Sequence, residues 1–270
     1  MYTQFTLTRN NITNLDVLIF NITQLPINGI EETEEAIIFY AEGENDAIIC
    51  ENYLNEGALV FTKVFLPPTN WNALWESNFP PVQVGGFLNI RADFHKSLIA
   101  DYKYEITINP KMSFGTGHHA TTQAVILLMQ GLNFKNKMVL DFGTGTGILA
   151  IFASMLGALH IDACDNDNWC IENSLENIAT NNIANINIFN ASTPLLNKNY
   201  NVVIANVNRH ILLNHGIALT NAVQPNGTLI ISGILDTDVP ELTNYFEAKG
   251  FRTIKAEIIN NWAGINFIKQ

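Results

Sequence analysis

A glycine-rich segment with the sequence Gly-Thr-Gly-Thr-Gly, residues 143–147, follows a short apolar stretch at 138–142. Glycines let a backbone turn sharply and approach a ligand closely, and ligands of parallel sheets bind beyond the carboxyl ends of the strands. The next predicted strand ends at Asp165, 22 residues after Gly143, where a carboxylate can accept hydrogen bonds from both hydroxyls of a ribose. This order of elements indicates a nucleotide-type binding site. A glycine turn that only joins two packed elements is the alternative.

The spacing of the glycines also bears on the kind of ligand. Dinucleotide folds favour G-x-G-x-x-G, in which the helix N-terminus receives a pyrophosphate, whereas here Asp141 precedes a loop that contains Gly143 and Gly145. A carboxylate would repel phosphate and attract an amino group, so the loop suits a cationic, phosphate-free ligand. S-adenosylmethionine has this chemistry, and the segment resembles the cofactor loop of class I methyltransferases. The predicted cofactor contacts from this segment are Asp141, Gly143, Gly145 and Asp165.

A second segment lies upstream of the glycine loop and reads Asn-Pro-Lys-Met-Ser-Phe-Gly-Thr-Gly-His-His-Ala-Thr-Thr, residues 109–122. It resembles the N-P-x-x-x-F-G-T-G-x-H-x-T-T segment of the bacterial methyltransferases that modify ribosomal protein L11 of the large subunit. The resemblance covers about residues 70–235 in motif order. It implies that the segment borders the cofactor and that Thr122 contacts it. Phe114, Gly115 and Thr116 are therefore also predicted to bind the cofactor.

A third motif ends the predicted strand 200–207, where Asn206 follows Ile204-Ala205. It resembles the A-N-I-L segment of the same family and, more loosely, the N-P-P-Y loop of amine methyltransferases. The resemblance implies that Asn206 is the catalytic residue and also borders the cofactor, because its carboxamide can accept an N–H of the nucleophilic amine and aim the lone pair. Asn208 and Arg209 depart from the family pattern and receive no role. Taken alone, an asparagine at a strand end more often makes an Asx turn.

These motifs predict an S-adenosylmethionine-dependent protein methyltransferase acting on amines. The sulfonium is a good leaving group, so the protein mainly aligns nitrogen, methyl and sulfur, which can be worth roughly 7–11 kcal/mol. A free lysine amine has a pKa of about 10.4, and desolvation in a closed site would lower it so that the neutral amine reacts. The resemblance implies that lysine side chains and the N-terminal amine of L11 are each methylated repeatedly.

The histidines and cysteines receive no role in this hypothesis. Adjacent His118 and His119 lack metal-site spacing and suit a capped helix start, while His210 and His215 suit a solvated helix face. Cys164 and Cys170 are expected to pack as small hydrophobic side chains. The three cysteines of the chain contain no C-x-x-C pair, so neither a disulfide framework nor a zinc ribbon is indicated.

From residue 104 to 270 the pattern alternates between short apolar strands and helices, which predicts a mostly parallel α/β sheet covered on both faces. The last two strands flank a turn at Asn260-Asn261, so the sheet should end in an antiparallel hairpin, as in the Rossmann-like fold of class I methyltransferases. A helix is expected over 210–223 and a turn at 225–227. The expected strands of the sheet are 138–142, 161–165, 186–189, 200–207 and 228–234.

Residues 1–65 follow the order strand, helix, strand, strand, helix, strand, which predicts a small α+β ferredoxin-like domain for substrate recognition. A helix start near Thr13 or Asn14 is indicated by capping preferences. Residues 66–103 form a predicted linker with connecting strands and a short helix around Trp71–Ser77 between proline pairs, the composition of a semi-rigid spacer. The methyltransferase domain would then span 104–270.

The net charge of −11 is concentrated at the N-terminus, where residues 1–62 carry ten carboxylates and only Arg9, a balance of −9. Such a segment favours steering of a basic partner and disfavours direct nucleic-acid binding, although an acidic surface can serve solubility alone. No apolar run approaches the ~20 residues of a membrane helix, and the first ten residues lack signal-peptide features. We therefore expect a cytoplasmic monomer that binds no membrane.

Three other hypotheses fit parts of the sequence. A class I methyltransferase could act on another protein, on an adenine of nucleic acid or on a small-molecule amine, although the acidic balance argues against nucleic acid. A nicotinamide-dependent oxidoreductase could use the same type of sheet. A noncatalytic adapter could bind basic proteins through the acidic segment.

Overall fold

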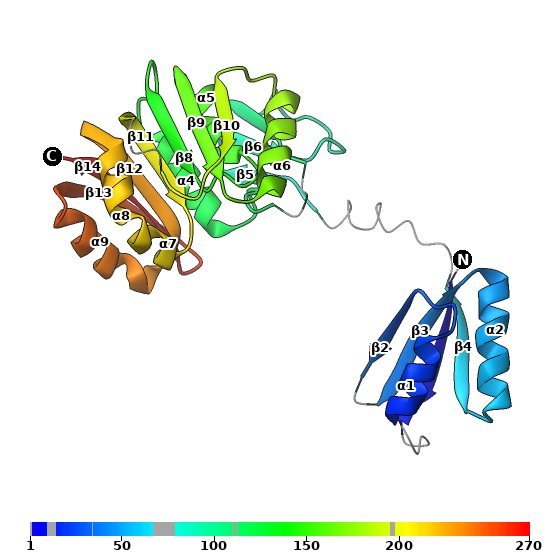
Figure 1. Ribbon diagram of the computed structural model, residues 1–270. Coiled ribbons are helices and arrows are strands. Elements are labelled where there is room, and N and C mark those ends of the chain that lie inside the picture. The colour runs from blue at the N-terminus through cyan, green and yellow to red at the C-terminus, as the bar shows by residue number, and fades with distance from the viewer. Residues whose placement is uncertain are drawn as a thin grey trace. The chain divides into compact units, whose positions relative to one another are not determined.

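A computed structural model describes residues 2–9, 15–33, 35–66, 79–109, 111, 113–194 and 198–270 (Figure 1). The chain forms two compact units, Met1–Phe79 and Pro80–Gln270, and each is described by itself. Two sequence predictions, the helix start near residues 13–14 and the helix around 71–77, lie outside the described residues. No helix in the described ranges is long and apolar enough to cross a membrane.

The N-terminal unit is an antiparallel four-stranded sheet with two helices, and its element order confirms the predicted ferredoxin-like pattern. Its core forms because alternate residues of β1, including Phe5 and Leu7, point inward against Phe39 and the apolar sides of the helices. The strand order is β2-β3-β1-β4. The elements are β1 (Tyr2–Thr8), α1 (Leu15–Thr23), β2 (Gly29–Glu32), β3 (Ala36–Glu42), α2 (Gly43–Glu56) and β4 (Phe61–Leu66).

The larger unit contains a seven-stranded sheet of order β10-β9-β8-β11-β12-β14-β13. The first five strands pair in parallel, while β14 pairs antiparallel with both β12 and β13. This arrangement confirms the predicted parallel sheet with its terminal hairpin. The strands are β8 (Met138–Phe142), β9 (His160–Asp165), β10 (Ile186–Asn190), β11 (Tyr200–Asn206), β12 (Val223–Leu235), β13 (Phe251–Ile259) and β14 (Trp262–Lys269).

Helices cover both faces of this sheet because neighbouring residues of each buried strand point to opposite sides. Val139 and Ile204 pack on one face with α4, α5 and α6, and Leu140 and Val203 pack on the other with α7, α8 and α9. The helices are α4 (Ala120–Gln130), α5 (Ile148–Met155), α6 (Asn168–Thr180), α7 (Arg209–Asn214), α8 (Gly216–Ala222) and α9 (Val239–Glu247), with a 3₁₀ turn η2 (Asp236–Asp238) before α9.

Two local predictions in this unit differ from the structure in detail. The helix expected over 210–223 is split at His215 into α7 and α8, where Gly216 lies so close to Tyr245 that a Cβ on it would be 2.3 Å from the phenol oxygen. The turn expected at 225–227 lies inside the long strand β12. Asn226 has a φ of 60° there, and the pairing of β11 with β12 shifts register between Tyr200 and Val202.

A small three-stranded sheet precedes the main sheet and consists of β5 (Val82–Val84), β6 (Leu88–Arg91) and β7 (Tyr104–Thr107). Residues 80–103, which the sequence assigns to the linker, lie in the larger unit. Their side chains contribute to its core, since Leu88 and Ile90 are buried among residues of the faces of α4 and α5.

Candidate active site

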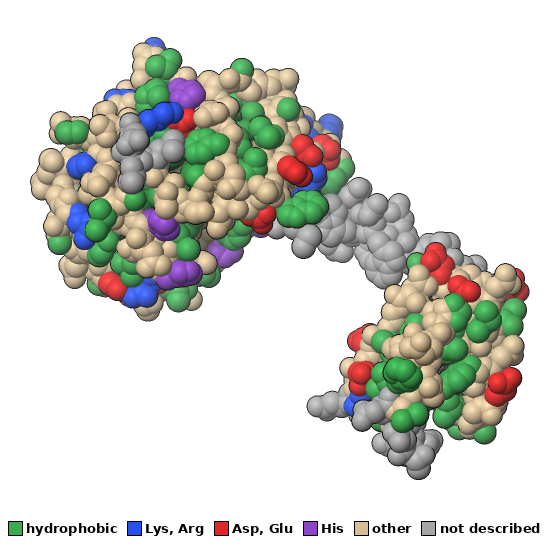
Figure 2. Space-filling view, in the orientation of Figure 1, with side chains coloured by type: hydrophobic (Ala, Val, Ile, Leu, Met, Phe, Trp, Pro, Cys, Tyr) green, Lys and Arg blue, Asp and Glu red, His purple; other side chains and the backbone are tan. Residues whose placement is uncertain are grey.

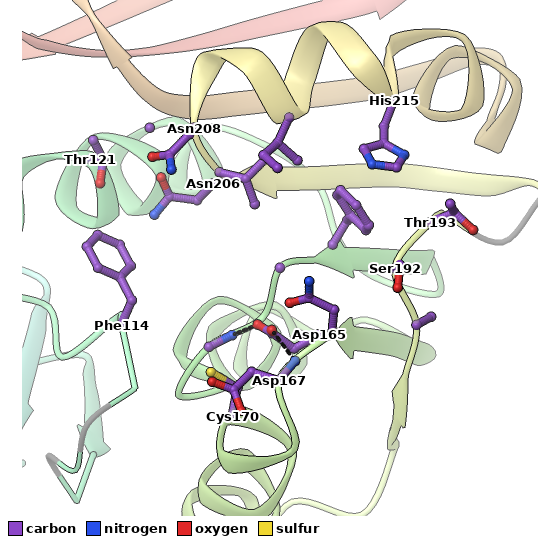
Figure 3. Close-up of a pocket in the computed structure, with 18 of the residues that line it drawn as sticks. Phe114, Thr121, Asp165, Asp167, Cys170, Ser192, Thr193, Asn206, Asn208 and His215 are labelled. Carbon is purple, nitrogen blue, oxygen red and sulfur yellow. Dashed lines mark hydrogen bonds between the residues drawn. The ribbon is translucent and has the colours of Figure 1, made fainter.

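A cavity of about 650 Å³ lies at the carboxyl ends of the parallel strands (Figure 3). Three strands deliver predicted site residues to it because their carboxyl ends meet at the same edge of the sheet. Gly143 and Gly145 follow β8, Asp165 ends β9, and Asn206 ends β11. Residues added by other parts of the chain include Phe114, His119, Ser192, Thr193 and Trp262.

The glycine loop requires glycine at the two predicted positions. Gly143 and Gly145 have φ values of 76° and 55°, a region that side chains with a Cβ rarely adopt. A Cβ on Gly143 would lie 2.3 Å from Cγ1 of Val207, and one on Gly145 would lie 2.3 Å from the carbonyl oxygen of Phe114. The glycines therefore let the loop approach both the strand end at β11 and the segment that contains Phe114.

The Asp165 carboxylate is fixed by two backbone amides, as the dashed lines in Figure 3 show. Its Oδ2 accepts from the amide of Gly145 at 3.0 Å, and its Oδ1 accepts from the amide of Asp167 at 3.1 Å. Each oxygen keeps a further lone pair for a ligand. The carboxylate thus lines the cavity in a fixed orientation.

In Figure 3, Asn206 lies next to Asn208 and points into the cavity from the side opposite Asp165. It is 9% exposed, and its Oδ1 is buried without a hydrogen-bond partner among the described residues. Leaving such an acceptor unpaired is costly, so Oδ1 of Asn206 is a candidate acceptor for a donor group of a bound molecule. Val207, the residue after Asn206, packs closely against Gly233, since a Cβ on Gly233 would lie 2.4 Å from the carbonyl oxygen of Val207.

Asp141 lies beneath the glycine loop, fully buried, and is not among the residues that line the cavity. Its Oδ2 accepts from the hydroxyl of Thr144 at 2.6 Å, while its Oδ1 has no partner in the described part of the chain. Burial raises the pKa of Asp141 to about 7, and the neighbouring Asp165 adds to the rise. Asp141 therefore shapes the loop from below.

The other residues predicted from the second segment separate into two places. Phe114 lines the main cavity, and together with Gly115 and Thr116 it lines an adjacent cavity of about 320 Å³. Thr122 is fully buried in the first turn of α4, and its Oγ1 has no partner among the described residues. Its neighbour Thr121 lines the main cavity instead.

Several lining residues were not found from the sequence. His119 caps α4, as the expected helix start predicted, with Nδ1 accepting from the amide of Thr121 at 3.3 Å. Its ring lies between those of Phe114 and Trp262, with centroids 5.2 and 4.7 Å away. Burial lowers the pKa of His119. Trp262 is the first residue of β14, the second strand of the terminal hairpin, and no local motif marks it as part of a site.

His215 also lines the cavity, so the prediction of a solvated face is wrong for it, whereas His210 is exposed as expected. The break between α7 and α8 turns the imidazole toward Phe142, with ring centroids 5.4 Å apart. Arg209 does not line the cavity. Its Nε donates to Glu241 at 2.8 Å and lies 3.5 Å from a carboxylate oxygen of Asp238. Asn208 occupies the N-cap position of α7.

The charge of the cavity favours a cationic ligand. Asp165 and Asp167 line it, and the described lining contains no lysine or arginine. A phosphate group would meet repulsion without a compensating cation. Within the described residues, no cluster of three or more His, Cys, Asp or Glu side chains could hold a metal ion.

A parallel sheet with a terminal antiparallel hairpin, a glycine loop after its central strand and a carboxylate at the next strand end together define a class I S-adenosylmethionine-dependent methyltransferase. The family model described as "Ribosomal protein L11 methyltransferase (PrmA)" matches residues 9–270. The chain belongs to this family, as its sequence motifs predicted.

Individual relatives agree with this assignment. The chain is 42% identical over 204 residues to a ribosomal protein L11 methyltransferase of Phocaeicola vulgatus, covering 74% of this chain and 72% of that protein. It is 34% identical over 264 residues to that of Porphyromonas gingivalis, covering 94% and 91%. The crystal structure of the ribosomal protein L11 methylase from Lactobacillus delbrueckii subsp. bulgaricus has a TM-score of 0.64 at 27% identity, covering 70% of this chain and 99% of that one.

Proposed function

We propose that this protein transfers methyl groups from S-adenosylmethionine to amines of ribosomal protein L11, both lysine side chains and the N-terminal amine. The observation that carries the proposal is the buried, unpaired Oδ1 of Asn206 in a cavity lined by carboxylates. The family to which the chain belongs supports the choice of substrate.

The cavity fits S-adenosylmethionine in charge and in hydrogen-bonding groups. The free lone pairs of Asp165 would accept the ribose hydroxyls, and the turn at Gly143 and Gly145 would let the ligand approach the backbone. When bound, S-adenosylmethionine supplies an electrophilic methyl group on a sulfonium. Phe114 would cover one side of the ligand. We assign supporting contacts, direct or through the loops, to Gly115, Thr116, Thr122 and Asp141.

Asn206 is the proposed catalytic residue and would also border the cofactor. Its Oδ1 would accept an N–H of the substrate amine and so aim the nitrogen lone pair along the line of transfer. The amine must be neutral to react, and desolvation in the cavity would lower its pKa from about 10.4. Positioning of this kind can supply roughly 7–11 kcal/mol of the barrier reduction, so a strong general base is not required.

The predicted domain 1–65, which lies in the N-terminal unit, is the proposed recognition domain for L11. Residues 1–62 carry a balance of −9. Described carboxylates such as Glu31 and Glu35 are exposed, and Figure 2 shows acidic side chains in red on the surface of this unit. Such a surface would attract a basic protein and repel free nucleic acid. We further propose that the enzyme acts as a monomer in the cytoplasm.

Intact mass spectrometry of recombinant L11 tests the proposal after incubation with the protein and S-adenosylmethionine. Mass increases by whole methyl groups on L11, confined by peptide mapping to lysines and the N-terminus, are expected. Calorimetry with S-adenosylmethionine and with NAD is the companion measurement. Binding of the cofactor without any methylation of L11, free or on large subunits, would instead favour another acceptor.

A further inference from the structure

Helix α6 carries three asparagines spaced by four residues, Asn173, Asn177 and Asn181, the last of them at its C-cap. Residues at this spacing lie on one face of a helix. Asn173 and Asn177 are buried, and buried polar groups are usually paired. Both polar atoms of the Asn177 side chain are paired, whereas Nδ2 of Asn173 has no partner among the described residues. None of the three lines the cavity.

The side chain of Asn177 joins two loops that are far apart in sequence. Its Oδ1 accepts from the backbone amide of Asn109 at 2.9 Å. Its Nδ2 donates to the carbonyl oxygen of Thr146 at 2.9 Å and to Oδ1 of Asn173 at 3.1 Å. Asn109 begins the segment 109–122, and Thr146 lies in the glycine loop. One carboxamide therefore ties the start of the first loop to the second.

The same two loops are tied again on the cavity side. The amide of Thr146 donates to the carbonyl oxygen of Phe114 at 2.9 Å, and its hydroxyl donates to the carbonyl oxygen of Gly115 at 2.5 Å. Thr146 is fully buried. Its peptide groups are thus bonded to Asn177 on one side and to the cavity-lining segment on the other.

We propose that Asn177 is a positioning residue for the cofactor site, acting through Thr146 to hold the Phe114–Gly115 backbone against the glycine loop. The inference rests on the proposed function, since it concerns the same cavity. Only a carboxamide of this length offers an acceptor to one loop and donors to the other without a buried charge. If both loops are held in place before binding, the free energy of ordering them does not reduce the affinity for the cofactor.

Asn181 provides a matched control. Its Oδ1 accepts from the amide of Thr107 at 2.9 Å, and its Nδ2 donates to the carbonyl oxygens of Thr107 and Asn177 at 2.7 Å. It has the same side chain and also makes three hydrogen bonds, but among the described residues none of them reaches the glycine loop. Asn181→Ala should therefore lower the free energy of unfolding through the lost hydrogen bonds and leave the two loops aligned.

The test compares Asn177→Ala with Asn181→Ala in the full chain by two measurements. Calorimetry with S-adenosylmethionine should give an about tenfold higher Kd for Asn177→Ala and a Kd close to that of the wild type for Asn181→Ala. Hydrogen exchange without ligand should quicken at 143–147 and 113–117 in the first variant only. Thermal unfolding shows whether both variants are folded and comparably destabilised.

Thr146 gives a second route if Asn177→Ala does not fold. Thr146→Val removes the hydroxyl bond to Gly115 and should weaken cofactor binding, whereas Thr146→Ser should restore it. Equal Kd values for Asn177→Ala, Asn181→Ala and the wild type would overturn the positioning role, as would exchange that quickens equally in both variants. Failure of the wild type itself to bind S-adenosylmethionine would instead contradict the proposed function.

Discussion

Asp165 accepts a hydrogen bond from the backbone amide of Gly145 at 3.0 Å. The carboxylate that ends β9 is therefore oriented by the loop that follows β8, two elements that adjoin because β8 and β9 pair in parallel. This contact fixes the distance between the two parts of the sequence that were predicted to bind one ligand.

Replacement of Asp165 tests the proposed ribose contacts. Asp165→Asn keeps an acceptor for Gly145 but loses the charge and one acceptor oxygen, while Asp165→Ala loses both. Because hydrogen bonds to charged groups contribute about 1.5–3 kcal/mol each, we expect the Kd for S-adenosylmethionine to rise at least tenfold in Asp165→Asn and further in Asp165→Ala. Calorimetry measures both, and an unchanged Kd in the alanine variant would place the ribose elsewhere.

Replacement of Asn206 tests its role toward the amine. Asn206→Ala should lower kcat by about 100-fold with a much smaller change in cofactor Kd, because the lost acceptor acts on the nucleophile. Ser232 pairs with Asn206 across β11 and β12 and donates to the carbonyl oxygen of Ala263 at 2.8 Å. Ser232 does not line the cavity, so Ser232→Ala is the control for a buried polar change next to Asn206. It should leave kcat near the wild-type value. Equal losses of kcat and of cofactor affinity in Asn206→Ala would contradict the assigned role.

Gly233 supports the strand end that carries Asn206, and a methyl group tests this support. Gly233 and Gly250 have φ values of 85° and 86°, but a Cβ on Gly233 would meet the Val207 carbonyl oxygen at 2.4 Å, whereas nothing lies within 4 Å of one on Gly250. Gly250→Ala should lower the free energy of unfolding by about 1 kcal/mol through backbone strain alone. Gly233→Ala should lower it clearly more and should also reduce turnover. Urea unfolding compares them. Equal costs would show that the contact with Val207 relaxes freely.

Asp141 predicts a particular pH dependence of stability. Its pKa is raised to about 7 in the folded protein and lies near 3.9 when unfolded. Between these values the folded state binds the proton more tightly, so this group lowers the free energy of unfolding as pH rises through that window, by up to about 4 kcal/mol in total. Asp141→Asn should therefore flatten the plot of unfolding free energy against pH between pH 4 and 8, measured by urea titration at each pH.

Asp162 is the contrasting case for the same urea titration. It accepts from Lys198 and from the hydroxyl of Tyr200 at 2.7 and 2.8 Å, and although burial opposes it, these and further hydrogen bonds lower its pKa to about 2. Its stabilisation is present above its unfolded pKa and is lost as pH falls toward 2, so Asp162→Asn should be destabilised at pH 5 and at pH 8 alike. For Asp141, identical slopes of unfolding free energy against pH in Asp141→Asn and the wild type would show that this carboxylate is ionised in the folded protein.

The acidic N-terminal unit predicts salt-dependent recognition of L11. Glu31→Gln with Glu35→Gln should raise KM for L11 a few-fold at low salt, and the deficit should shrink as salt rises, because the Debye length is already about 8 Å at physiological ionic strength. The Kd for S-adenosylmethionine is the internal control and should not change. A KM equal to the wild-type value at every salt concentration would reject electrostatic steering by these two residues.

The sequence by itself determined the family, the order of the elements and the edge of the sheet where the site lies. These features depend on local relations: an apolar strand followed at once by Gly143, and strand ends at Asp165 and Asn206. Parallel strands bring their carboxyl ends to one edge whatever the details of packing, so residues from separate motifs could be predicted to meet there.

Only the tertiary structure decided which side chains complete the cavity. Trp262 reaches it through the terminal hairpin and His215 through the break between α7 and α8, features that no local pattern encodes. Asp141 belongs to the motif but is buried beneath the loop, and Asn177 matters through bonds to residues 68 and 31 positions away. Burial and long-range hydrogen bonds follow from how whole elements pack, and the spacing of residues along a strand or a helix does not specify that packing.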